Sequence, residues 1–268
     1  MFAIQQRLET LTHKWWFYLV LLALFFLPTY SARPFDPRRT SDVITAVLSN
    51  PLIYSYPSIM PIFKALPVLL ALALALWGDK VTRLVNIYVT LTIFLFAWFQ
   101  NAALTPEFGF AVVLGNAVVY SLVALVWCWE TVIKVNELHL RRQPLWRYWV
   151  IPVGFLAFWF PLNPETLGPD FSLAQLLTNN AGLTLCMMLP VYLAILILCY
   201  PTINRAALRI TSFAGIVTAC LNVLQWFFFT SYTWLGIFHL PLLTISLYGI
   251  FLSFSQVPKS VVKENRVL

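Results

Sequence analysis

Residues 66–76 read LPVLLALALAL, and residues 189–199 read LPVYLAILILC. Both runs open on Leu-Pro-Val and continue without a charged residue. A helix on the surface of a soluble protein has a polar face, whereas a helix in hydrocarbon is apolar all round. The two runs therefore predict helices that lie in a membrane, and their similarity indicates an internal duplication.

The composition of the whole chain supports a membrane protein. Of 268 residues, 60% are apolar and only 10% are charged, and the mean hydropathy is +0.80. Soluble domains have roughly 45–50% apolar and about 25% charged residues, so this chain has too little polar surface to face water. The net charge of +7 comes from short basic clusters between apolar runs, which is typical of membrane flanks. We therefore expect the lipid bilayer, and not nucleic acid, to be the partner.

Eight apolar runs are long enough to cross the hydrocarbon core, which is about 30 Å thick. They predict an all-α integral membrane protein with eight transmembrane helices. The predicted spans are near residues 15–30, 57–77, 83–101, 108–131, 146–161, 182–200, 208–229 and 232–254.

The lysines and arginines between these spans predict the orientation. Thirteen fall on the side that holds both termini, and three (Arg33, Arg38 and Arg39) fall on the opposite side. Basic residues in short connections favour the cytoplasmic side, so both termini are expected in the cytoplasm. The first span has the alternative of being a signal peptide cleaved after Ala32, but Tyr30 is too bulky for the position three before that cut. We favour a retained span.

The order of matches along the chain predicts two parallel repeats of four helices. The repeats are residues 1–133 and 146–256, joined by a basic cytoplasmic loop at 134–145 and followed by a cytoplasmic tail at 257–268. An offset of 128 residues aligns Trp98-Phe99 with Trp226-Phe227. An even number of spans in each unit makes the repeats parallel, related by an axis along the membrane normal.

Two prolines and two loops recur in the repeats. Pro67 and Pro190 each remove a backbone hydrogen bond inside a span, so we expect both helices to bend. The carbonyl that each proline leaves free must find cover in lipid, which places the bends against other helices or along a wet cavity. Residues 41–50 and 171–180, in the outer loops, are expected to form short helices on or in the outer face.

Polar residues within the spans are the candidates for a substrate path, because burial in lipid makes them costly. For Lys64, snorkelling to the outer surface is favoured over binding of an anion. The asparagines are expected to form hydrogen bonds between helices, and the histidine is expected to bond to a carbonyl. Glu130, at an inner helix end, is expected to pair with Lys134. The seven path candidates are Lys64, Pro67, Asn116, Pro190, Asn222, Gln225 and His239.

The sequence contains no motif that names a reaction. It has no Walker A loop, no Gly-x-Gly-x-x-Gly, no His-Glu-x-x-His and no Gly-x-Ser-x-Gly. Its four cysteines, Cys128, Cys186, Cys199 and Cys220, lie in apolar runs without metal or redox spacing, so neither a metal nor another cofactor is expected. The outer loops lack an Asn-x-Ser/Thr sequon, which fits a prokaryotic cytoplasmic membrane.

Three functions remain open at this stage. The leading prediction is a small-molecule transporter or permease with a path between the two repeats. The alternative is a non-transporting anchor or assembly subunit, bound to a protein partner or to further copies of itself, because charge within the spans is scarce. The third is an intramembrane enzyme that modifies lipids, but the converging carboxylates or histidines that it needs are not apparent, so an enzyme is the less favoured reading.

Overall fold

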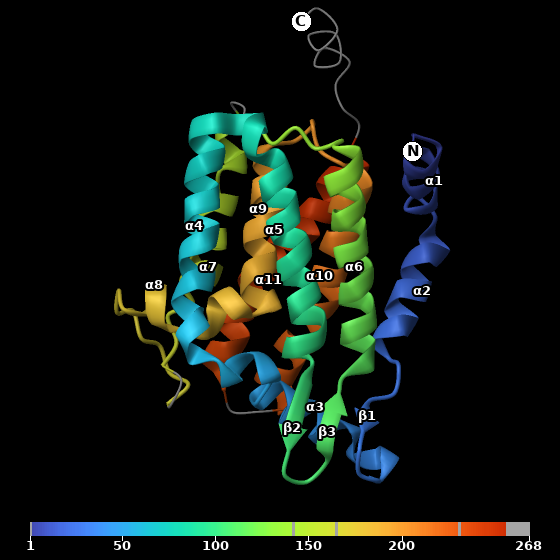
Figure 1. Cartoon of the computed structure of the whole chain (residues 1–268), viewed down its shortest axis with the longest axis vertical. Coiled ribbons are helices and arrows are strands. Elements are labelled where there is room, and N and C mark those ends of the chain that lie inside the picture. Colours follow the sequence, from blue (N-terminus) through green and yellow to red (C-terminus); the bar gives the residue numbers. More distant parts are fainter. Residues whose placement is uncertain (1, 141–142, 164–165, 230–231, 256–268) are drawn as a thin grey trace, which may run out of the picture.

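The computed structural model describes residues 2–140, 143–163, 166–229 and 232–255. An N-terminal helix, α1 (Phe2–Leu11), precedes eight apolar helices that run alternately up and down, so that α1 and the end of the last helix lie at the same end of the bundle (Figure 1). The predicted tail at 257–268 and two residues of the predicted linker, 141–142, lie outside the described residues. The eight helices are α2 (Trp15–Phe25), α4 (Met60–Trp77), α5 (Thr82–Leu95), α6 (Leu114–Ile133), α7 (Val150–Trp159), α9 (Leu185–Leu198), α10 (Arg205–Leu224) and α11 (Thr233–Phe254).

Four helical runs within the described residues are long and apolar enough to cross a membrane. The pair Gln175–Leu183 and Leu185–Leu198, bent by 93°, makes a fifth if it is counted as one span. Helices α2 and α7 have 11 and 10 residues and are shorter than a crossing requires on their own. The eightfold crossing therefore stays a prediction. The four runs are Pro57–Gln100, which contains α4 and α5, Leu114–Ile133, Arg205–Phe229 and Thr233–Phe254.

The chain is not all-α, because a small sheet covers one end of the bundle. Strands β1 (Tyr30–Ser31), β2 (Ala102–Thr105) and β3 (Gly109–Val112) pair antiparallel in the order β1-β3-β2. The predicted span at 108–131 therefore begins too early, since residues 109–112 form a strand and α6 starts at Leu114. A short apolar run does not distinguish strand from helix by its pattern, which is why the sequence misled here.

Helix α3 (Thr40–Ser49) packs on this sheet and makes a second, small core. Val43 and Val47 of α3 are fully buried against Ala103, Phe108 and Ala111. The short helix expected at residues 41–50 is thus confirmed, although it packs on strands.

An arginine ties this cap together at the surface. Arg39 contacts Asp42 at 2.9 Å and Glu107, in the β2–β3 turn, at 2.7 Å. The hydrogen bonds that Arg39 donates to these two carboxylates raise the pKa of Arg39 above its ordinary value, Glu107 contributing most. Because the groups are exposed to solvent, these pairs add little to the stability of the protein.

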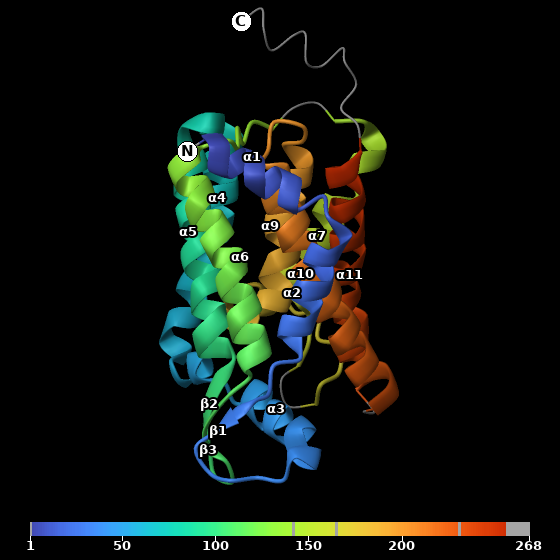
Figure 2. The same ribbon diagram turned by 90° about the vertical axis from the view of Figure 1, so that its right-hand side faces the viewer.

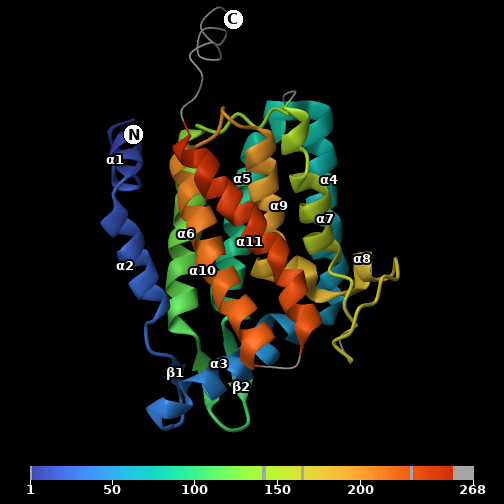
Figure 3. The same cartoon turned by 180° about the vertical axis from the view of Figure 1, so that it is seen from behind.

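The second half of the chain forms the densest part of the bundle. Helix α9 contacts α7, α10 and α11, and all but three of its residues are buried. Helices α10 and α11 lie side by side in Figures 1 and 3 and approach closely through small residues. Gly215 of α10 faces Ser246 of α11, and Gly249 of α11 faces Ser212 of α10. Small residues of this kind let helix backbones come together in membrane proteins.

The two halves share some features and differ in others. Helix α5 pairs with α6 as α10 pairs with α11, and α2 contacts α6 as α7 contacts α11. A π-helical segment also follows both α5 and α10, as η5 (Phe96–Gln100) and η8 (Gln225–Phe229), close to the predicted offset of 128. Helix α4, however, lies at the edge against the second half, whereas its counterpart α9 is central. The parallel repeat stays a prediction.

Candidate functional site

The predicted path residues are spread over α4, α6, α9, α10, η8 and α11. Asn116 is in the first turn of α6, at the end that carries the sheet, where its Nδ2 donates to Asn101 Oδ1 at 2.9 Å. Asn222 is in the last turn of α10, and its Nδ2 donates to Thr218 O at 2.9 Å. Asn116 thus lies close to one end of its helix, because α6 starts later than the predicted span at 108–131.

The three remaining candidates of the second half lie on different elements. His239 is buried in α11 with its Nδ1 2.6 Å from Leu235 O, which confirms the expected bond to a carbonyl. Gln225 opens the π-helical segment η8 and is exposed. Pro190 is buried in the middle of α9, where its carbonyl lies beside Gly154 of α7. Nothing in the described part of the chain joins these residues to one another.

Among the seven predicted path residues, Lys64 is a buried cation. Its side chain is fully buried, its Nζ donates to the carbonyl of Phe158 in α7, and the same nitrogen lies 4.5 Å from the centre of the Phe158 ring. Snorkelling is therefore wrong, because the side chain turns inward against α7. Among the described residues no carboxylate lies within 4 Å of Lys64. A buried ammonium group normally has a paired anion. Lys64 instead has one carbonyl and one aromatic ring as partners.

The carbonyl released by Pro67 is covered by a glycine from the second half of the chain. Pro67 cannot donate to the carbonyl of Phe63, four residues earlier in α4. Gly182, in the short helix η7 (Asn180–Leu183), packs on that carbonyl so closely that a Cβ there would lie 2.6 Å from Phe63 O and 3.2 Å from Lys64 N. The expectation that the freed carbonyl is covered by neighbouring segments is confirmed. Only glycine allows this approach.

Directly after η7 the chain turns sharply into α9, and polar groups gather at the break. Thr184 Oγ1 lies 3.0 Å from the Tyr54 hydroxyl and donates to Asn180 O at 2.9 Å. Burial raises the pKa of Tyr54 to about 12, so its hydroxyl stays protonated. Gln100 Oε1 accepts from the first backbone N–H of α9, on Leu185, at 2.9 Å. The predicted short helix at 171–180 is present as the single turn α8 (Gln175–Thr178), which leads into this break.

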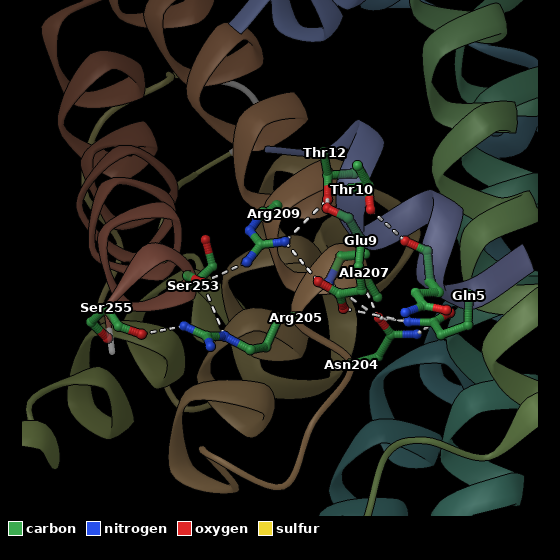
Figure 4. A network of polar contacts seen from close by, with 12 residues as sticks. Gln5, Glu9, Thr10, Thr12, Asn204, Arg205, Ala207, Arg209, Ser253 and Ser255 are labelled. Atoms are coloured by element: carbon green, nitrogen blue, oxygen red, sulfur yellow. Dashed lines mark hydrogen bonds and ion pairs between the residues drawn. The ribbon is translucent and has the colours of Figure 1, made fainter. Parts of the chain in front are cut away.

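A larger polar cluster lies at the other end of the bundle, and Figure 4 shows its centre. Arg209 of α10 is 1% exposed; it contacts Glu9 Oε2 of α1 at 2.8 Å and donates to Thr12 Oγ1 at 3.1 Å and to Ser253 O of α11 at 3.0 Å. Nearby, Arg205 donates to Ser253 O at 3.0 Å. The ion pair therefore joins the N-terminal helix to the last two helices.

Asn204 connects this ion pair to a second buried acid. Its Oδ1 caps α10 and accepts from Gln5 Nε2 of α1 at 3.0 Å, while its Nδ2 donates to Glu130 Oε2 of α6 at 2.7 Å. Glu130 also accepts from the backbone N–H of Asn136 at 2.6 Å. The predicted pairing of Glu130 with Lys134 is wrong, because Lys134 ends α6 in the left-handed conformation, with φ of 55°, and Glu130 turns toward Asn204.

Sequence patterns gave little sign of this polar cluster. Glu9 and Arg209 are 200 residues apart, and only the packing of α1 across the bundle end, seen in Figure 2, brings them together. A signal was present in Asn204, since an asparagine directly before an apolar helical run marks an N-cap. These contacts anchor α1 to the bundle, while Arg209 Nε is left without a hydrogen-bond partner within the described residues.

The described residues contain no group of three or more His, Cys, Asp or Glu side chains that could hold a metal ion. Their charged groups instead gather at the two bundle ends, apart from Lys64. The contact between α4, α7 and η7, where Lys64 lacks a paired carboxylate, is therefore the candidate functional site. No protein-family model, no curated protein and no solved structure matches this chain.

Proposed function

We propose that the protein is a permease for a small anionic solute in a prokaryotic cytoplasmic membrane. In this proposal the chain crosses the membrane eight times as two parallel repeats, with both termini in the cytoplasm. The alternation of the eight helices supports that topology. The basic residues Lys80, Arg205 and Arg209, on elements at the bundle end that carries α1, support it as well. The positive-inside rule assigns the basic end to the cytoplasm.

The observation that carries the proposal is the buried cation at Lys64. An ionisable group at membrane depth is costly, and the cost is tolerated where the group serves function. Lys64 has one carbonyl partner and one ring but no paired carboxylate among the described residues. A carboxylate or phosphate group of a solute supplies the charge that this site lacks.

The surroundings of Lys64 suit a site that opens and closes. Its backbone lies against η7, which is followed at once by a 93° bend into α9. Transporters place their sites at broken helices of this kind. Only 17% of the most apolar part of the run Pro57–Gln100 is buried, and a separation of α4 from η7 would uncover the buried side chains of Lys64 and Pro67. We infer that this separation admits the solute to Lys64.

Replacing Lys64 with methionine tests the proposal, because methionine keeps the length of the side chain and removes its charge. Uptake of inorganic phosphate and of small carboxylates into proteoliposomes should fall at least about tenfold, since a cation–anion contact in a desolvated site contributes more than 1.4 kcal/mol. The unfolding temperature should stay the same or rise, because an unpaired buried charge is removed.

Lys80→Met is the matched control, since Lys80 is exposed in the turn between α4 and α5. It should leave both uptake and stability unchanged. If intact wild-type protein moves none of these anions, or if Lys64→Met moves them at the wild-type rate, the permease proposal is lost.

The alternative function, an assembly subunit, is supported by the exposed surface of the hairpin that α4 and α5 form. The α4–α5 run leaves most of its most apolar part uncovered, while 61% of the corresponding part of Arg205–Phe229 is buried. A partner helix seated on this hairpin would copurify in mild detergent at a fixed stoichiometry. Native mass spectrometry measures this directly, and a lone monomer would count against the subunit.

A further inference from the structure

We propose that the groove between α1 and α2 binds the phosphate headgroup of an anionic phospholipid from the surrounding leaflet. The groove has a volume of about 500 Å³. Gln6, Arg7, Thr10, Lys14 and Trp16 line it, together with two apolar side chains of α1. None of the residues proposed for solute transport takes part, so the site is independent of the permease proposal.

The charges in the groove suit an anion. Arg7 and Lys14 are exposed, and among the described residues neither has a carboxylate within 4 Å. The acid of α1, Glu9, is turned to the other face of the helix, where Arg209 holds it at 2.8 Å. The groove therefore presents two cations without a compensating acid on its lining.

The two faces of α1 explain how the groove is kept in place. Gln5 and Glu9 fasten one face to Asn204 and Arg209 of α10. Residues 3, 6, 7 and 10 repeat at helical spacing on the opposite side of α1, and Lys14 follows in the link to α2; all of them line the groove. Because the first face of α1 is fixed to α10, Arg7 is held near Lys14 and the start of α2.

The position of the groove favours a lipid over a soluble anion. Figure 2 shows α1 lying across the end of the bundle and α2 running along its side. Trp16 lies in the first turn of α2, at the place where an interfacial tryptophan is expected. Leu19 and Val20 follow Trp16 at i+3 and i+4, and both are more than half exposed. An acyl chain can lie along this face while the headgroup reaches Arg7 and Lys14.

The test is a lipid titration of the full chain in detergent, with bound lipid counted by native mass spectrometry. Phosphatidylglycerol should bind with one saturable site, and zwitterionic phosphatidylcholine should bind at least tenfold more weakly. Each basic residue near an anionic lipid contributes about 1 kcal/mol, so Arg7→Gln/Lys14→Gln should weaken phosphatidylglycerol binding about 25-fold. The exposed, charge-matched double variant Lys80→Gln/Arg83→Gln, at the same bundle end, should bind as the wild type does.

Three results would overturn the proposal. The first is equal binding of the two lipids. The second is unchanged binding by Arg7→Gln/Lys14→Gln, or an equal loss in the Lys80→Gln/Arg83→Gln control. The third is full displacement of phosphatidylglycerol by millimolar inorganic phosphate, which would assign the groove to a soluble anion. Thermal unfolding of each variant without added lipid verifies that it is folded.

Discussion

Replacing Glu9 with methionine is expected to lower the free energy of unfolding by about 3–5 kcal/mol, which is the usual cost of leaving one member of a buried ion pair alone. Arg209 is 1% exposed on its side chain and keeps only neutral partners when the carboxylate is gone. Glu9 itself is 32% exposed, so Arg209→Met leaves a carboxylate that water can reach and should cost less. Reversible unfolding in mixed micelles measures both losses.

The double variant Glu9→Met/Arg209→Met separates the ion pair from the packing. Since both charges are removed together, it should be more stable than Glu9→Met alone, and the two effects should couple by more than about 1 kcal/mol. Glu137→Met is the control, because Glu137 is an exposed acid at the same end of the bundle. A coupling near zero, or an equal loss in the control, would show that the pair does not hold α1.

Replacing Gly182 with valine is expected to be the second large effect. A Cβ at this position lies 2.6 Å from Phe63 O and 2.8 Å from Phe63 C, which are backbone atoms of α4 that cannot rotate away. Overpacking of this kind costs about 1–3 kcal/mol, and valine adds two further methyl groups to the clash. The freed carbonyl of Phe63 also loses its cover, so η7 and α4 should separate.

Gly154→Ala is the matched control for Gly182→Val. A Cβ at Gly154 would lie 3.5 Å from the Cβ of Ala194, which is ordinary van der Waals contact, so this buried helical glycine tolerates a methyl group. Its unfolding temperature should stay near the wild-type value while that of Gly182→Val falls by several degrees. Equal behaviour of the two variants would mean that η7 does not pack on α4 as described.

Hydropathy predicted where the apolar helices lie, because twenty apolar residues in a row leave few alternatives to a helix in lipid. It also predicted the covered carbonyl after Pro67, since that follows from the missing N–H of proline. The facing of side chains was not predictable in this way. Lys64 turns inward because α7 offers the Phe158 carbonyl, and nothing near Lys64 in the sequence indicates that contact.

The sheet and the polar cluster around Arg209 and Asn204 were missed for different physical reasons. Strand β3 is as apolar as a span, so its pattern does not separate the two. The local signs of a turn were Pro106 and Gly109, whose φ is 67°. The polar cluster depends on contacts between residues about 200 positions apart, such as Gln5 with Asn204. Such contacts follow from tertiary packing, which a local pattern does not contain.

The partner of Lys64 is synthesised late. Phe158 follows Lys64 by 94 residues, so at about 5–20 residues per second the ribosome needs roughly 5–20 s to deliver it. During that interval α4 has neither the Phe158 carbonyl nor the backbone of Gly182 against it. In the proposed topology, the hairpin of α4 and α5 therefore waits beside the insertion machinery or in lipid with its ammonium group uncovered, and it docks once the latter half of the polypeptide has entered the bilayer.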